Sequence, residues 1–510
     1  MKSRQSLTWT IIGSLGFAFV LLSGSCKSKE KLPSLGDKVS GPIDVATAPN
    51  GKLFYALNSD YQRRFNEGSL QVIDSEPADG STYKIATIPT RRLGQTMHVA
   101  QNLLLITYDH PEKTSEGYAE LWSLANEAQP ALLVTWELQC APVNAIIAPT
   151  RPYLAVSCAT GQIYLGTWSN STPAGASLDL VRNYGFEHRA LYFYESTKTW
   201  LLGFPSDSGD PRQGDLALVD KLSFEKASEK LLDKPNTVPD VFESTAANRR
   251  RASQTLPFQM FVYNLSDEEA ASAAAQAAGD SSFVHFRNIA LGGTYTDPTL
   301  ANQELNYVSY VLRELNGQPN SSEGTAELYS RSYRTNFYDA KPDFEGRADT
   351  FYLSQRGKTP GSAGNSILKL RIDESVLNRI LEEKVPFEQI FSVERIYGYE
   401  PDRDTNGRYP GDFELLDLDG EPMVIINHFR DVINFSGATF YGITRKLLSE
   451  SHALDRPESA DSTAYQDSYF QIAASPSGKV LTASFYGDAL FLFDAHPRIS
   501  IKDQIPTRIE

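Results

Sequence analysis

Residues 48–58 read APNGKLFYALN, and residues 68–74, after a short spacer, read GSLQVID. Near the other end of the chain, residues 475–483 read SPSGKVLTA and residues 487–494 read GDALFLFD. Each pair combines a Pro-x-Gly-Lys turn, an apolar strand, a Gly-led turn and a second strand that ends in Asp. Pro and Gly supply the tight turn, and the apolar and aromatic residues that follow favour a β-sheet. Copies of one strand–turn–strand unit therefore stand at both ends of the chain.

A third copy lies at residues 148–157, APTRPYLAVS, followed by GQIYL at residues 161–165. Its Pro149 follows Pro49 by 100 positions, which leaves room for two units of roughly 45–50 residues each. The unit between them shows expected strands at 97–100, 103–108, 120–122 and 132–136. Further expected pairs are 190–204 with 216–219, 350–353 with 367–370, and 423–426 with 438–441.

These units resemble the repeats of YVTN and WD40-like β-propellers, whose blades each contain four antiparallel strands. The resemblance implies an all-β fold with about seven blades, in which repetition around a ring protects the sheet edges. Blades 1–4 are expected at residues 39–222, and the remaining blades at residues 346–510.

Residues 223–345 break this rhythm with Lys/Glu-rich and Ser/Asn-rich passages. They contain a helix candidate at 267–278, begun by a capping box of Ser266 with Glu269 and stopped by Gly279. We interpret the region as a mixed subdomain inserted on one face of the ring. The alternative is an eighth, degenerate blade that contains residues 283–291 and 307–315.

The N-terminus has the features of an export signal. Lys2 and Arg4 precede an apolar run at residues 7–22, which is short for a bilayer span of roughly 20 residues. Small residues then lead to Cys26, so residues 1–25 are interpreted as a signal peptide and residues 26–38 as a tether.

Residues 21–26, LLSGSC, resemble the bacterial lipobox, in which the Cys is lipidated and becomes the new N-terminus. Ser23 stands where the family usually has Leu, and an ordinary secretory signal is the alternative. The resemblance implies a Cys26 that carries acyl chains such as palmitate, two or more of which anchor stably. Lys27 in place of Asp implies the outer membrane, facing the periplasm or the exterior.

Net charge restricts the class of partner, and the cysteines bear on whether the chain contains a disulfide. A net charge of −15, with no basic block beyond Arg249, Arg250 and Arg251, argues against a nucleic-acid partner. Outside the reducing cytoplasm, Cys140 and Cys158 can form a disulfide between adjacent strands, or remain two small buried residues.

The best metal candidate is the run that begins at Asp402 and continues with Asp404 and Asn406, to which Asp412 could be added. Carboxylates and an amide at alternate positions suit calcium. The twelfth place of an EF-hand loop, usually Glu, is Phe413 here. The same string also forms solvated turns through its Asx side chains, which is the alternative.

A polar cluster of His428, Arg430 and Asp431 follows an apolar strand, where functional loops usually lie. It is the first candidate for a surface site, and an ion-paired turn explains it equally well. No nucleophile elbow, zinc helix motif or phosphate loop stands in the chain, so no catalytic residue is assigned.

Together these features favour a membrane-anchored, extracytoplasmic binding or scaffold module with a protein or glycan partner in the cell envelope. The alternative is a propeller enzyme, a lactonase-like hydrolase or a quinoprotein dehydrogenase, that uses a metal in the channel. Fold by itself does not decide between them.

Overall fold

The computed structural model describes residues 32–78, 81–169, 172–183, 469–485 and 488–495, and between 191 and 450 the strands of the sheets. Within these residues every regular element is a β-strand, and the strands form eight antiparallel sheets. The first sheet contains β1 (Pro42–Thr47), β2 (Leu53–Asn58), β3 (Gly68–Asp74) and β4 (Lys84–Thr90). The second contains β5 (Gly94–Ala100), β6 (Leu103–Asp109), β7 (Gly117–Ser123) and β8 (Ala131–Leu138). The third contains β9 (Pro142–Ile147), β10 (Tyr153–Cys158), β11 (Gln162–Ser169) and β12 (Thr172–Asn183).

The later sheets vary more in strand number. The fourth has β13 (Leu191–Tyr194), β14 (Thr199–Pro205) and β15 (Ala217–Ser223). The fifth has β16 (Thr255–Asn264), β17 (Val284–Asp297), β18 (Gln303–Asn316) and β19 (Leu328–Tyr333). The sixth has β20 (Phe337–Pro342), β21 (Thr350–Gln355), β22 (Ser366–Ile372) and β23 (Phe391–Gly398). The seventh has β24 (Tyr409–Leu418) and β25 (Glu421–Phe429), and the last has β26 (Ile443–Glu450), β27 (Tyr469–Ala474), β28 (Lys479–Ser484) and β29 (Ala489–Ala495).

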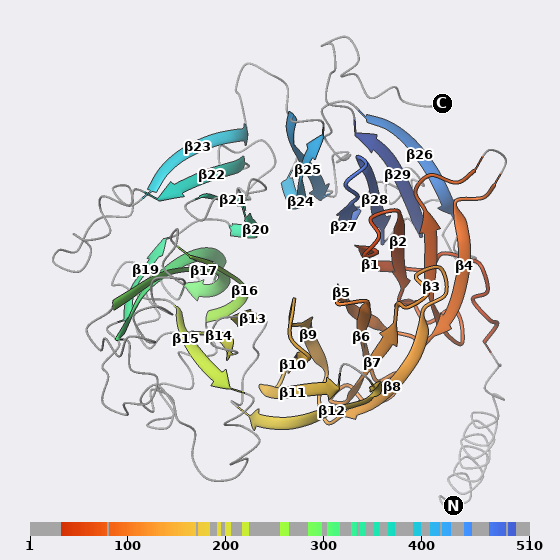
Figure 1. The fold of residues 1–510 in the computed structure, drawn as a ribbon, viewed down its shortest axis with the longest axis horizontal. Coiled ribbons are helices and arrows are strands. Elements are labelled where there is room, and N and C mark those ends of the chain that lie inside the picture. Colours follow the sequence, from red (N-terminus) through yellow and green to blue (C-terminus); the bar gives the residue numbers. More distant parts are fainter. Residues whose placement is uncertain are drawn as a thin grey trace, which may run out of the picture.

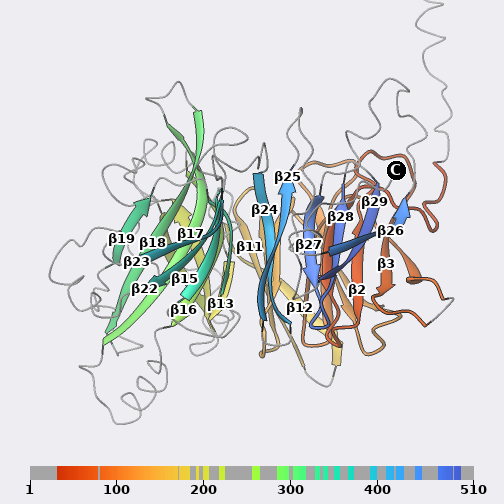
Figure 2. The same ribbon diagram turned by 90° about the horizontal axis from the view of Figure 1, so that it is seen from above.

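The sheets are arranged radially around a common axis (Figure 1). The strands nearest the axis contact one another in the order β1, β5, β9, β13, β16, β20, β24 and β27, and β27 contacts β1 again. Seen from the side, the strands run roughly along the axis, so their turns gather at the two ends of the ring (Figure 2). An all-β ring of antiparallel sheets, most of them four-stranded, is the architecture of a β-propeller.

The repeated turns fold as the sequence predicts. Gly51 has a φ of 69° and Gly478 a φ of 85°, the left-handed conformation that glycine adopts at little cost. Gly51 N–H donates to Ala48 O at 2.9 Å, and in the last sheet Gly478 N–H donates to Ser475 O at 3.0 Å. The two turns thus have equivalent hydrogen bonds at opposite ends of the chain.

Apolar side chains between neighbouring sheets form the core. One cluster joins the first and second sheets around Leu57 and Ile106, and another joins the second and third around Leu105 and Val156. A third cluster packs the first sheet against the last, the contact that we call the seam. The seam brings together Val39, Val45, Phe54, Ala56 and Ile73 with Ala473, Leu481, Ala483, Leu490 and Leu492.

The predicted all-β fold with four-stranded antiparallel sheets is confirmed. Within the region interpreted as an insertion, residues 255–333 contribute the fifth sheet, and the pair expected in an eighth blade falls on β17 and β18. The helix candidate at 267–278 and the expected strand at 438–441 lie outside the described residues.

Candidate functional site

The strands nearest the axis share an irregularity close to where they begin. Among the eight described, all except β13 have a shift in pairing register there, which is the signature of a β-bulge. A bulge bends the strand and re-aims its side chains, and bulges are common next to functional sites. Each shift contains or adjoins a polar residue, namely Asp44, Thr96, Asn144, Gln259, Asp339, Asp412 and Gln471.

Three polar side chains on these strands accept hydrogen bonds from the next strand around the axis. Asp44 on β1 accepts from Met97 N–H on β5 at 2.7 Å, and also from Val45 N–H at 2.9 Å. His98 Nδ1 on β5 accepts from Ile147 N–H on β9 at 3.2 Å. Asp412 on β24 accepts from Ile472 N–H on β27 at 3.3 Å. The polar residues thus connect adjacent sheets near the axis.

Charges gather among them in a group that we call the axial cluster: Asp44, Lys341, Asp412 and Glu414. Lys341 Nζ lies 3.5 Å from Asp412 Oδ1 and 3.3 Å from Glu414 Oε1. Loss of water around Asp44 raises the pKa of its carboxyl from 3.8 to about 7, although its two N–H donors and the charge of Lys341 act in the opposite direction. Asp44 remains partly accessible, so its protonation can respond to what binds near it.

Burial has the reverse effect on the neighbouring histidine. It lowers the pKa of His98 from 6.5 to about 4, so this imidazole is neutral at physiological pH. Because Nδ1 accepts a backbone hydrogen bond, the proton of the neutral ring sits on Nε2. His98 therefore presents a donor rather than a charge.

The charged side chains of the axial cluster form ion pairs with one another. A lysine ammonium between two carboxylates already occupies the position that a cation would take. In the described part of the chain, no group of three or more His, Cys, Asp or Glu side chains is placed to hold a metal ion. The axial cluster offers mixed charges and neutral donors, which can bind polar groups of a partner.

The predicted site residues are distributed unevenly over the structure. Asp412 is buried and belongs to the axial cluster, whereas Asp402, Asp404 and Asn406 lie outside the described residues. His428 lies on β25 opposite Pro410, while Arg430 and Asp431 are outside the described residues, as is Cys26. The calcium loop, the surface cluster and the lipid anchor therefore stay predictions.

The two remaining cysteines lie together at the start of the third sheet. A disulfide joins Cys140, just before β9, to Cys158 at the end of β10, with Cα atoms 5.8 Å apart. Both residues are fully buried within the cluster between the second and third sheets.

Sequence reasoning missed Asp44 and Lys341, and it considered Glu414 only as a substitute calcium ligand, although a signal for part of the site existed. Four of the seven bulged strands carry Pro two positions before the polar residue, at Pro42, Pro142, Pro257 and Pro410. A Pro-x-Asp/Asn/Gln string at the start of a strand marks these positions. No comparable pattern marks Lys341 or Glu414, which share an ion pair only because β20 and β24 are neighbours.

The comparisons with known proteins do not identify the chain. No family model and no curated protein matches it. Similar solved structures include the β-propeller domain of Cps50 (Swd1) from Myceliophteria thermophila, at 10% identity over 90% of this chain and 98% of that one, with a TM-score of 0.40. Sqt1 from Saccharomyces cerevisiae matches at 10% identity, covering 92% and 99%, with a TM-score of 0.41. The propeller of Dos1 matches at 9% identity, covering 92% and 96%, with a TM-score of 0.44.

Proposed function

We propose that this chain is a binding or scaffold propeller of the cell envelope, held to a membrane through a lipidated Cys26. The observation that carries the binding part is the row of polar residues at the bulged starts of the axial strands. The register shifts lie near the starts of these strands, and a bulge re-aims the side chains beside it. A protein or glycan partner is the ligand class that mixed charges and neutral donors suit.

The end of the ring at which the axial strands begin also carries the loops between β2 and β3 and between β4 and β5. Leu93 N–H, between β4 and β5, donates to Ser59 O, between β2 and β3, at 2.6 Å, and Asp109 N–H donates to Leu93 O at 2.9 Å. We call this end the entry end, because β1, β5 and β9 begin there. The partner is proposed to bind over the axial residues at the entry end.

The number of blades belongs to the same proposal. A sheet at residues 255–333 with a bulged first strand favours eight blades over seven with an insertion. Limited proteolysis separates the two readings. An inserted subdomain should be released without loss of the ring, whereas removal of a blade should unfold the ring.

A photo-crosslinking experiment tests the binding site. Gln471 is partly exposed at the start of β27, and Gln129 is exposed on the β7–β8 turn at the opposite end of the ring. With benzoylphenylalanine at either position in cells, we expect envelope adducts from position 471 and few from 129. Equal labelling at the two positions would contradict a partner site at the entry end.

The lipid anchor has its own test. Cys26→Ser should release the protein from the membrane fraction into the soluble fraction, because acyl chains supply the attachment of an acidic chain. Retention of the variant on membranes after a salt wash would show that lipid does not hold it. The second function, a metal-dependent propeller enzyme, rests on the loop that begins at Asp402, and calcium analysis of the purified protein decides whether that loop binds an ion.

A further inference from the structure

The chain enters the fold beside the loop that joins β2 to β3. Asn66 N–H donates to Pro33 O at 2.9 Å, and the Ser34 hydroxyl donates to the Glu67 carboxylate. Residues 32–38 and 59–67 therefore form one surface at the entry end, which we call the tether corner. It is the part of the described fold that lies closest along the chain to Cys26.

The length of chain that separates this corner from Cys26 is small. Only residues 27–31 stand between Cys26 and Leu32. A fully extended chain spans at most 3.3–3.6 Å per residue, so six steps reach about 20 Å. If Cys26 carries lipid, the tether corner cannot lie farther than that from the membrane surface.

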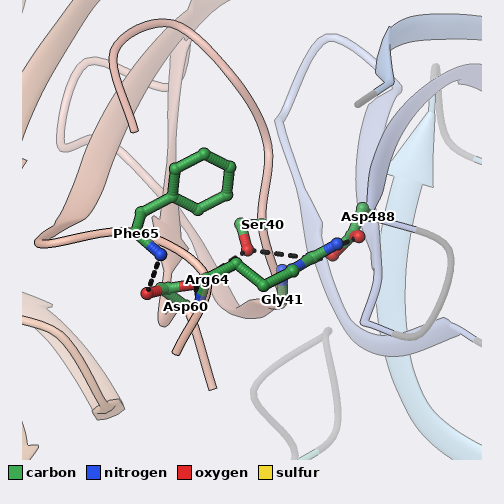
Figure 3. Close-up of polar contacts among 6 residues, drawn as sticks. All are labelled: Ser40, Gly41, Asp60, Arg64, Phe65 and Asp488. Carbon is green, nitrogen blue, oxygen red and sulfur yellow. Dashed lines mark hydrogen bonds and ion pairs between the residues drawn. The ribbon is translucent and has the colours of Figure 1, made fainter. Parts of the chain in front are cut away.

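Polar contacts join the corner to the body of the ring (Figure 3). Arg64 forms an ion pair with Asp488 of the last sheet at 2.5 Å, and Asp488 also accepts Gly41 N–H at 2.7 Å. Asp60 accepts the N–H groups of Arg64 and Phe65 at 3.0 and 2.9 Å. Because these groups are largely buried, the loop cannot swing away from the ring without breaking them.

The exposed side chains of the corner suit a headgroup layer. Tyr61 is 60% exposed, and its ring centroid lies 5.7 Å from that of Phe485. Tyrosine favours the membrane interface, because its ring is apolar and its hydroxyl is polar. Arg63 beside it is also exposed, and Lys38 lies 5.4 Å above the Phe65 ring.

Charge at the corner differs from that of the whole chain. The corner has three cationic residues (Lys38, Arg63 and Arg64) and three anionic ones (Asp37, Asp60 and Glu67), which balance, while the chain carries −15. An anionic membrane should repel the acidic bulk but not this surface.

We propose that the tether corner is the membrane-facing surface of the protein, with Tyr61 in the headgroup layer of the bilayer that holds Cys26. This inference rests on the lipid anchor proposed above. It places the entry end, and a partner bound there, close to the membrane.

Photo-crosslinking in vesicles tests the orientation. The full-length lipidated protein, with benzoylphenylalanine at Tyr61 or at Gln129, is reconstituted into vesicles of phosphatidylethanolamine and phosphatidylglycerol and floated on a density gradient. Both sites are exposed, so the probe is tolerated at either. Mass spectrometry of the floated protein should find severalfold more lipid adduct at position 61 than at position 129.

The outcomes separate the two proposals. If the protein floats and position 129 labels as strongly as position 61, the anchor stands and the orientation is wrong. If the lipidated preparation does not float, the anchor fails and the orientation fails with it. Flotation with adducts confined to position 61 supports both.

Discussion

The first and last sheets use the same sequence unit but complete it differently. Both begin their second strand after a Pro-x-Gly-Lys turn with equivalent hydrogen bonds, and both pair that strand with two antiparallel neighbours. In the first sheet the outer strand β4 follows β3 in the chain. In the last sheet the outer strand β26 comes before the other three and pairs with β29. The repeated unit therefore defines the two middle strands of each sheet, and the outer strand can come from elsewhere in the chain.

The seam between these two sheets has both an apolar and a polar part. Phe54 of β2 and Leu481 of β28 are fully buried in its core. Thr47 donates from β1 to Ala474 O at 2.8 Å, and Arg64 reaches Asp488 on the turn before β29. Contacts within a sheet follow from local sequence, whereas these contacts join residues more than 400 positions apart.

The largest expected effect comes from a cavity at the seam. Leu481→Ala should lower the free energy of unfolding by about 2–5 kcal/mol, because a fully buried leucine leaves an unfilled space. Leu105→Ala, in the cluster between the second and third sheets, is the matched control and should lose a similar amount. Chemical denaturation measures both, and a near-neutral Leu481→Ala beside a costly Leu105→Ala would mean that the seam is not packed.

Removal of the disulfide is expected to cause the next largest loss of stability. Replacing both Cys140 and Cys158 by Ser should cost about 3 kcal/mol, because the bridge restricts a loop of some 18 residues in the unfolded chain. Thermal unfolding with and without reductant measures this. Reductant should lower the unfolding temperature of the parent protein and leave that of the double variant unchanged. Free-thiol labelling of both cysteines in the oxidised protein would rule out the bridge.

A smaller effect is expected from His98 as the pH falls. Its folded pKa of about 4 lies below the ordinary 6.5, so its contribution to stability is present above pH 6.5 and is lost as the pH falls towards 4. His98→Gln retains an acceptor for Ile147 N–H and cannot titrate. The free energy of unfolding, measured between pH 7 and pH 4, should therefore fall more steeply with falling pH for the parent than for the variant. Equal slopes would contradict the burial of this imidazole.

The contribution of Asp44 to the free energy of unfolding should depend on pH in the opposite direction. Its folded pKa of about 7 lies above 3.8, so its contribution is full below pH 3.8 and is lost as the pH rises through 7. Asp44→Asn loses the acceptor for one of two backbone N–H groups, so it should be less stable than the parent at pH 4. That deficit should shrink as the pH rises to 7, and a constant deficit would show that Asp44 titrates normally.

The strands of the repeated units could be predicted because turn chemistry and apolar runs are local. Gly51 and Gly478 occupy the left-handed positions that their turns require, and the strands after them are buried. Residues 255–333 have no such turn, and their strands are longer, up to the 14 residues of β17 and β18. Sheet structure in this part depends on pairing between strands, which composition alone does not reveal.

The candidate site was predictable only in part, and for a similar reason. Asp412 drew attention as a carboxylate near a polar turn, but the predicted role was as a calcium ligand. The structure instead gives it Lys341 and Ile472 N–H as partners, from the two neighbouring sheets. Such inter-sheet contacts depend on the order of sheets around the axis, which no short motif encodes.

A double-mutant cycle on Arg64 and Asp488 tests most directly whether the first and last sheets meet. The variants are Arg64→Met, Asp488→Asn and both together, each measured by chemical denaturation of the full chain. Because the pair is largely buried and 2.5 Å apart, we expect a coupling energy of about 1–3 kcal/mol, with the double variant less impaired than the sum of the single ones. Additive losses would mean that the two residues do not interact, and that the ring does not join at this seam.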